Sequence, residues 1–199
     1  LLNILGKRSD GFHELETVIV PVAVEDRLSF ERIGESVQLT CSDPMLPTNG
    51  KNLVFRAAAL CLQAAGISEG VRIHLEKRIP VAAGLGGGSG NAAVTLAAVN
   101  ELFGSPLTQM QLAELAASLG SDIPFFLQTR PALATGRGEK IQMLDNFAAL
   151  QHAYVMLVYP GFGISTPWAY QQLARFPEAL NGKPGRAEKL ISLLRKGNA

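Results

Sequence analysis

The feature that most constrains this chain is a glycine-dense run between two segments of different periodicity. Residues 71–77 alternate apolar and polar side chains, which predicts a strand, and residues 91–103 are alanine-rich, which predicts a helix that Gly104 closes. Five of the seven residues from Gly84 to Gly90 are glycine. The fold must therefore pass from a strand into a helix through backbone that few side chains cover.

We call this run the glycine loop; it comprises Pro80, Val81, Ala82, Ala83, Gly84, Leu85, Gly86, Gly87, Gly88, Ser89, Gly90 and Asn91. Glycine leaves backbone N–H groups unshielded and permits positive φ, so the loop suits an anion. A helix that begins near 89–91 adds unpaired N–H donors and a positive dipole end. The pattern predicts a phosphate-binding loop, and a packed or flexible loop without a ligand is the alternative.

Several familiar glycine motifs do not fit this loop. A Walker A loop needs Gly-Lys-Ser/Thr at its end, and none is present. The dinucleotide fingerprint fails because Ser89 or Asn91 stands where its last glycine should be, and Asn91 also breaks the serine-hydrolase elbow. The protein-kinase motifs His-Arg-Asp and Asp-Phe-Gly are absent, and the three histidines offer no evident triad base.

Composition excludes several function classes. The formal net charge is +1, from 18 basic and 17 acidic residues, so we expect neither nucleic acid nor an anionic membrane as a partner. Cys41 and Cys61 stand twenty positions apart without a Cys-x-x-Cys pair, so we expect two thiols in a reducing compartment and no structural metal. No apolar run approaches the roughly 18 residues of a membrane span. We expect a cytoplasmic protein, or a stromal one in a plastid-bearing organism.

The remaining patterns predict the rest of the fold. We expect further strands at 1–5, 16–24, 27–32, 36–41, 132–135 and 154–159. The segments 27–32 and 36–41 alternate as two paired, half-buried strands would. We expect further helices at 52–65, 108–119, 123–127, 166–173 and 186–195. Strands, then helices, then strands indicate an α+β fold, with a change of domain near 146–152.

The glycine loop, entered from a strand and followed by an alanine-rich helix, resembles the ATP-binding motif of the GHMP kinases. These are small-molecule kinases that act on galactose, homoserine, mevalonate and related alcohols. The resemblance implies that residues 80–91 bind ATP. Asn52, ahead of a helix, resembles the segment that meets the adenine, and Lys77 falls where the family has a nucleotide-contacting lysine. From the residues alone, an N-cap asparagine and a solvated lysine remain equally good readings.

A second segment, residues 6–17, resembles one branch of this superfamily. Its members phosphorylate 4-diphosphocytidyl-2-C-methyl-D-erythritol, a CDP-linked substrate of non-mevalonate isoprenoid synthesis. The resemblance implies that Phe12, where the branch has tyrosine, stacks on the cytosine and that His13 bonds to its edge. Tyr170 falls where an aromatic ring closes the other face. A turn with a packed aromatic and a capping histidine is the alternative.

A third segment, residues 119–126, resembles the stretch that carries the catalytic aspartate of the family. The resemblance implies that Asp122 accepts the proton of the substrate hydroxyl or orients that hydroxyl, whereas its place before a helix also suits an N-cap. The implied reaction is direct transfer of the ATP γ-phosphoryl group with Mg²⁺, for which no dedicated carboxylate stands out.

The resemblance covers the chain but not the whole family pattern. It implies a two-layer N-terminal GHMP domain with a left-handed βαβ crossover at 1–149 and the beginning of the C-terminal α+β domain at 150–199. The family's first strand, with its catalytic lysine, and a later glycine-rich motif are not in the sequence, so we expect an internal fragment. Gly90 replaces a second serine of the loop. Another GHMP kinase, of the homoserine or mevalonate type, and a nucleotide-binding domain without turnover remain alternatives.

Overall fold

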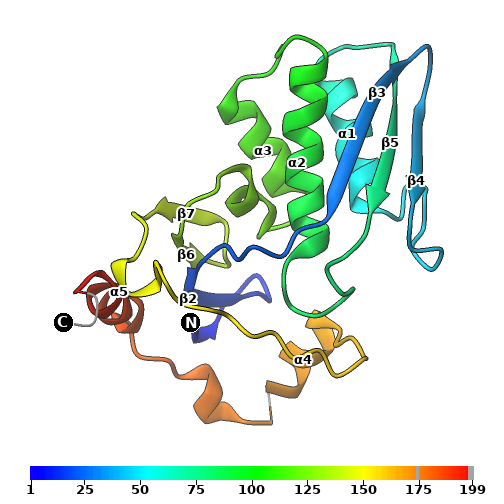
Figure 1. Cartoon of the computed structure of the whole chain (residues 1–199). Coiled ribbons are helices and arrows are strands. Elements are labelled where there is room, and N and C mark those ends of the chain that lie inside the picture. Colours follow the sequence, from blue (N-terminus) through cyan, green and yellow to red (C-terminus); the bar gives the residue numbers. More distant parts are fainter. Residues whose placement is uncertain (174, 197–199) are drawn as a thin grey trace. The chain divides into compact units, whose positions relative to one another are not determined.

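The computed structural model describes residues 1–173 and 175–196 (Figure 1). It is a mixed α+β fold, as the sequence predicts, and it divides into two compact units. The central unit is Val24–Leu127, and the terminal unit combines Leu1–Ala23 with Gln128–Ala199. This division describes which residues pack together, and it does not test the domain boundary expected near residue 150. That boundary stays a prediction.

The central unit is built on a three-stranded sheet. Its strands are β3 (Arg27–Ile33), β5 (Gly70–Glu76) and β4 (Val37–Cys41), in the order β3-β5-β4. The expected pairing of β3 with β4 is wrong, because β5 lies between them, antiparallel to β3 and parallel to β4. The alternate residues Val71, Ile73 and Leu75 of β5 are at most 2% exposed, so the most apolar strand takes the central place.

Two helices, α1 (Leu53–Ala64) and α2 (Gly87–Leu102), cover one face of this sheet, and α3 (Gln109–Leu119) packs against both of them (Figure 1). The helix α1 connects the parallel strands β4 and β5, which makes a βαβ unit; its left-handed sense stays a prediction. Sheet and helices form the two layers expected for this part of the chain.

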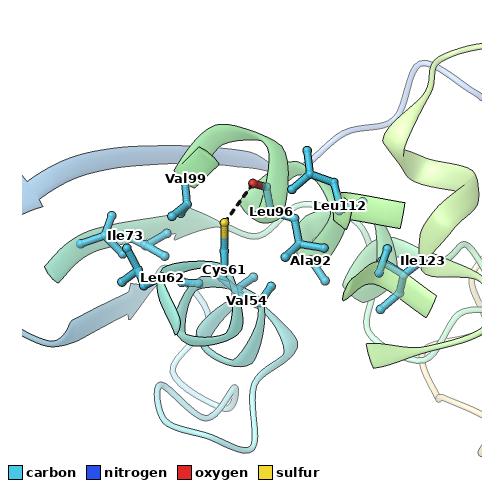
Figure 2. Packing of buried hydrophobic residues seen from close by; sticks show 14 of the residues in the cluster. Val54, Cys61, Leu62, Ile73, Ala92, Leu96, Val99, Leu112 and Ile123 are labelled. Carbon is cyan, nitrogen blue, oxygen red and sulfur yellow. Dashed lines mark hydrogen bonds between the residues drawn. The ribbon is translucent and has the colours of Figure 1, made fainter. Parts of the chain in front are cut away.

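The core of the central unit lies between the helices and the sheet (Figure 2). Ala57, Ala58, Ala92 and Ala93 are fully buried, and their small side chains let α1 and α2 pack closely. The Cys61 thiol donates to the Leu96 carbonyl oxygen at 3.6 Å, and burial raises its pKa to about 11. Such a thiol is a packing group and a poor nucleophile.

Local signals set both ends of α1 and the start of α3 as predicted. The Asn52 side chain caps α1, and Gly66 follows the helix with φ of 66°. Thr108 and Gln111 form the predicted capping box at the start of α3. These signals act within a few residues, which is why the sequence alone reveals them.

The terminal unit is built on a four-stranded antiparallel sheet. Its strands are β1 (Leu2–Lys7), β2 (His13–Ile19), β6 (Ala132–Gly136) and β7 (Lys140–Met143), paired in the order β1-β2-β6-β7. The strand predicted at 16–24 is displaced: β2 starts earlier and ends before Pro21, which has no N–H to donate. The short strand β7 was not predicted.

Helix α5 (Arg186–Lys196) packs on this sheet through Ala187 and Ile191, against Val18 and Leu133. The unit also holds α4 (Thr166–Leu173), as predicted, and two short 3₁₀ helices, η2 (Ala148–Leu150) and η3 (Pro177–Leu180). A third, η1 (Ile123–Leu127), belongs to the central unit and was expected as a short helix.

A buried carboxylate ties α5 to the sheet. Glu16 of β2 is 5% exposed and accepts the backbone N–H groups of Gly185, Arg186 and Ala187, with N···O distances of 3.3, 2.9 and 3.1 Å. The Asn3 side chain of β1 also donates to it, at 2.7 Å. Because the first N–H groups of a helix lack partners within the helix, Glu16 caps α5 from a distant strand.

The strand expected at 154–159 does not form. Tyr154 is fully exposed and Val158 is 81% exposed, and no described strand pairs with this segment. Alternation shows only that a segment suits a sheet, and an isolated extended backbone gains no ladder hydrogen bonds. Across residues 1–173 and 175–196, no helix is both long and apolar enough to cross a bilayer.

Candidate functional site

The glycine loop forms the entrance to α2, but the helix begins earlier than predicted. Gly86, with φ of 66°, is its N-cap, and α2 starts at Gly87, not near residues 89–91. The first intrahelical bond runs from the Gly90 N–H to the Gly86 oxygen at 2.8 Å. The N–H groups of residues 87–89 therefore have no acceptor within the helix. Free N–H groups at a helix start are the arrangement that binds anions.

The structure separates glycines that packing requires from one that it does not. A Cβ on Gly86 would lie 2.4 Å from Cζ of Phe126 in η1, so only glycine fits there. A Cβ on Gly90 would lie 3.4 Å from the same ring, which is tight but less restrictive. A Cβ on Gly88 would meet only Leu53, at 3.7 Å, an ordinary contact. Neither crowding nor a positive φ calls for glycine at 88, and the binding of phosphate at this position stays a prediction.

The residue proposed as catalytic lies beside this loop. The Ser89 hydroxyl of α2 donates to a carboxylate oxygen of Asp122 at 2.8 Å. Asp122 precedes η1 and is exposed to solvent. Two motifs that are 33 positions apart in the sequence therefore present a carboxylate and the amino end of α2 to the same place.

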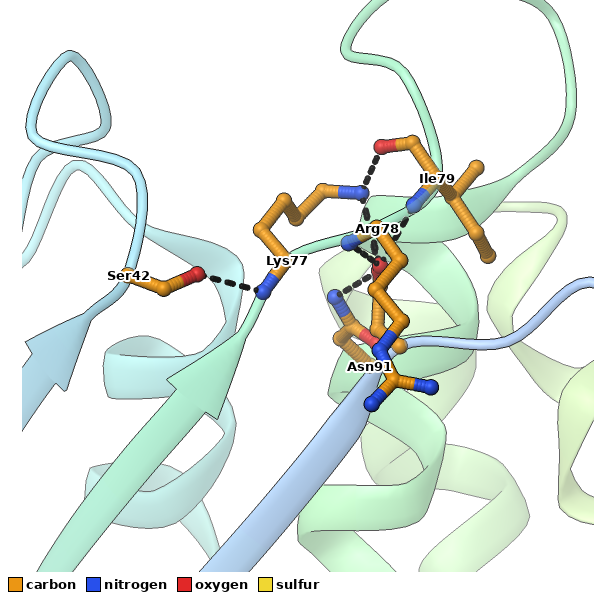
Figure 3. Close-up of polar contacts among 6 residues, drawn as sticks. Ser42, Lys77, Arg78, Ile79 and Asn91 are labelled. Atoms are coloured by element: carbon orange, nitrogen blue, oxygen red, sulfur yellow. Dashed lines mark hydrogen bonds and ion pairs between the residues drawn. The ribbon is translucent and has the colours of Figure 1, made fainter.

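Lys77 lies in a cluster that the sequence did not reveal (Figure 3). Its ammonium donates to both oxygens of Asp26, at 3.1 and 2.8 Å, and to the Ile79 carbonyl oxygen. Asp26 also accepts the N–H groups of Arg78 and Ile79, at 2.6 and 2.7 Å, and the Asn91 side chain, at 2.8 Å. The side chain of Lys77 is 8% exposed and that of Asp26 fully buried.

These contacts keep Asp26 ionised. Burial by itself would raise the pKa of the Asp26 carboxyl, but the hydrogen bonds from Lys77, Arg78, Ile79 and Asn91 outweigh burial and hold the pKa below its usual range. No sequence signal marks Asp26: it stands between Glu25 and Arg27 at the start of a strand, where charged residues are usually solvated.

Asn52 acts as the N-cap that its residue type suggested. Its Oδ1 accepts the Val54 N–H at 2.9 Å, and its Nδ2 donates to the Pro47 carbonyl oxygen at 2.8 Å. Both ends of the amide are thus engaged within the chain. A direct contact of Asn52 with adenine stays a prediction.

The rings predicted to bind cytosine lie in the terminal unit, where each already has a neighbour. The rings of His13 and Tyr170 lie 4.9 Å apart at 31°. Phe12, which is 50% exposed, has the Arg137 guanidinium 4.9 Å from its ring centre. Asp10 accepts the Phe12 N–H at 3.1 Å and so shapes the turn between β1 and β2 that presents these rings. The expected sandwich of a base between Phe12 and Tyr170 stays a prediction.

Comparison with known proteins identifies the family. Residues 52–130 match the GHMP kinases N terminal domain. Over 199 residues the chain is 42% identical to 4-diphosphocytidyl-2-C-methyl-D-erythritol kinase of Pelotomaculum thermopropionicum, an alignment that covers 100% of this chain and 67% of that protein. The chain belongs to this kinase family.

Two further family members agree. The chain is 44% identical over 173 residues to the kinase of the same name from Protochlamydia amoebophila. This alignment covers 86% of this chain and 58% of that protein. A crystal structure of 4-(cytidine 5'-diphospho)-2C-methyl-D-erythritol kinase matches with a TM-score of 0.70 and 39% identity, over 85% of this chain and 59% of that one. The chain thus spans less than two thirds of the length of these two kinases.

Besides Asp26, sequence reasoning missed two further residues at these sites. Arg137, on the Phe12 ring, directly follows Gly136 at the end of β6, and its position between two glycines could have marked it as a loop residue free to reach a neighbour. Phe126 could have been found from the resemblance, because it lies in the same segment as Asp122. Its contact with the glycine loop depends on tertiary packing alone.

Proposed function

We propose that the protein transfers the γ-phosphoryl group of ATP to a hydroxyl of 4-diphosphocytidyl-2-C-methyl-D-erythritol, a step of non-mevalonate isoprenoid synthesis. The observation that carries this proposal is the 2.8 Å contact between Ser89 and Asp122. It joins a phosphate-binding helix start to a carboxylate, in a chain 42% identical to a kinase named for that substrate. We expect the reaction to take place in the cytoplasm, where ATP is abundant.

In the proposed reaction, the N–H groups of the glycine loop bind the β- and γ-phosphates. The hydroxyl oxygen of the substrate forms a bond to the γ-phosphorus while the bond from that phosphorus to the β–γ bridging oxygen breaks, and ADP leaves. The hydroxyl proton passes to Asp122 and then to solvent. Because such transition states need little covalent help, the main task of Asp122 is to orient the hydroxyl, and the Ser89 bond restricts its rotamer.

Mg²⁺ enters this proposal as part of the substrate MgATP. Among the residues that the structure describes, no group of three or more His, Cys, Asp or Glu side chains could hold a metal ion. Phosphate oxygens and water are sufficient ligands for Mg²⁺, which commonly binds proteins through one or two carboxylates only. The ion would neutralise charge that develops on the phosphates.

The terminal unit supplies the proposed cytidine contacts. Phe12 and Tyr170 would each stack on one face of the base, worth about 1 kcal/mol a face. His13 would hydrogen-bond to the edge of the base, since an imidazole both donates and accepts. Burial raises the pKa of the Tyr170 hydroxyl, so this ring stays neutral when it stacks.

The test is release of ADP by the expressed protein with MgATP and this CDP-linked alcohol. The Asp122→Asn variant should lose about 100-fold in kcat and keep its Kd for ATP within about twofold, as expected when a group acts on the reacting hydroxyl. The matched control is Glu114→Gln, which removes an exposed carboxylate from α3 and should change neither quantity. Unchanged turnover in Asp122→Asn would contradict the role of Asp122.

The same assay distinguishes the alternatives. A homoserine or mevalonate kinase has no need of a cytidine pocket, so CDP should bind this protein and compete with the substrate only if the proposal is right. Turnover of homoserine or mevalonate without CDP binding would overturn the proposed substrate. Binding of ATP without ADP release on any of these alcohols would leave a nucleotide-binding protein in place of a kinase.

A further inference from the structure

We propose that Asp26 is a positioning residue for the phosphate-binding loop, and that Lys77 serves the nucleotide through Asp26 and not by touching it. The inference rests on the proposed function to the extent that the glycine loop binds ATP. It concerns residues of the central unit only.

The first argument is where Asp26 makes its contacts. Its carboxylate accepts the N–H groups of Arg78 and Ile79, directly before the glycine loop, and the Asn91 side chain at the loop's last residue (Figure 3). One side chain, more than 50 positions away from each partner, therefore joins both ends of the loop. A loop with tethered ends keeps fewer conformations, so less entropy is lost when its N–H groups close on a phosphate.

The second argument is that the Lys77 ammonium is already engaged. It has three N–H donors, and it contacts both Asp26 oxygens and the Ile79 carbonyl oxygen. Its side chain is only 8% exposed. A direct bond to ATP would break one of these contacts beside a fully buried carboxylate, at a cost in desolvation.

The third argument is that the cluster touches the start of α2. A Cβ on Gly87, the first residue of the helix, would lie 3.0 Å from Cγ2 of Ile79 and 3.4 Å from the Lys77 ammonium nitrogen. The start of α2 thus packs directly against the side chains of Ile79 and Lys77. A shift of Lys77 would move the N–H groups that are proposed to hold phosphate.

The main experiment is the Asp26→Asn variant, which keeps the shape of the side chain and replaces one acceptor oxygen with a donor that faces Lys77 or Asn91. We expect KM and Kd for ATP to rise about tenfold, with KM for the acceptor within about twofold of wild type. Thermal denaturation checks that the variant is folded at the assay temperature. The control Glu31→Gln breaks an exposed ion pair with Arg72 on the same sheet and should leave all these values unchanged.

A double-mutant cycle with Lys77→Met tests the indirect role of the lysine. If Lys77 acts only through Asp26, the double variant should bind ATP no more weakly than the weaker single variant. Losses that add would show a separate contact of Lys77 with ATP and would overturn that part of the inference. A folded Asp26→Asn variant with unchanged Kd for ATP would overturn the role of Asp26.

If Asp26→Asn does not fold, Asn91→Leu takes its place, because it removes one tether of the loop and keeps the ion pair. A Kd for ATP raised about threefold or more would support the inference, and an unchanged Kd would overturn it. These outcomes are separate from the fate of the proposed function. If the wild-type protein binds no ATP, the proposed function is refuted. If the wild-type protein binds ATP and the folded Asp26→Asn variant binds it equally tightly, only this inference is refuted.

Discussion

Each of the two units holds a buried carboxylate that joins segments distant in sequence, but the two carboxylates have different partners. Asp26, in the central unit, faces the Lys77 ammonium. Glu16, in the terminal unit, faces the amino end of α5 and the Asn3 amide. In both cases several N–H donors hold the pKa below its usual range against the effect of burial.

The difference lies in what remains if the carboxylate is removed. At residue 26 a nearly buried ammonium would lose its counter-charge, which costs far more than a lost hydrogen bond. At residue 16 only neutral N–H groups would lose their acceptor, and an unpaired neutral N–H group costs less than an unpaired buried charge. A buried ion pair therefore makes its site far more sensitive to substitution than a helix cap does, even where the two make a similar number of hydrogen bonds.

The largest effect should follow Asp26→Ala. It leaves Lys77 buried and unpaired, so we expect the free energy of unfolding to fall by about 3–5 kcal/mol. The double variant Asp26→Leu with Lys77→Met replaces the pair with apolar groups and should recover most of that loss. Urea denaturation measures both values. Equal losses in the single and double variants would break the comparison, because the unpaired charge would then not be the cause.

A smaller effect, on binding and not on stability, should follow Gly88→Ala in the loop that Asp26 holds. The new methyl group would meet only Leu53, and alanine suits a helix better than glycine, so the unfolding midpoint should not fall. It would stand where phosphate is proposed to approach the backbone, so affinity for ATP should fall about tenfold in calorimetric titration. Gly86→Ala is the contrast: its methyl group would collide with Phe126, and this variant should lose stability. Full ATP affinity in folded Gly88→Ala would refute the phosphate-binding loop.

The smallest effect should follow Glu16→Gln. The amide still accepts N–H bonds from α5, so we expect a loss of about 1 kcal/mol, from the missing charge at a helix start. Affinity for ATP should be unchanged. Because the folded-state pKa of Glu16 is lowered, its contribution is present above its ordinary pKa of 4.5 and is lost as the pH falls through the folded value. The gap between wild type and variant should therefore close on acidification, and a gap that persists would contradict this assignment.

Much of the candidate site was predictable because its signals are local. The glycine loop, the N-cap Asn52 and the capping box at Thr108 each involve residues within a few positions of one another. The alternation of apolar and polar side chains predicted the strand β5. Segment resemblances also pointed to Asp122, and the structure places this residue against Ser89 of the loop.

The errors have a common physical origin in long-range pairing. The segment 154–159 alternates like a strand yet has no partner strand among the described residues, and β3 and β4 each pair with β5 and not with each other. Which strands pair depends on all the segments of similar apolarity that could pair with one another. The hydrophobic pattern of a single segment therefore does not predict its neighbours in the sheet.

The sequence by itself determined where the backbone turns, caps and exposes its N–H groups, because glycine, asparagine and threonine act on dihedral angles and hydrogen bonds a few residues away. Only the tertiary structure decided that Asp26 would hold both ends of the glycine loop and that Phe126 would pack on Gly86. Such contacts form when packing removes water from groups far apart in the chain. Their energy depends on which groups become buried together, and no local pattern specifies that.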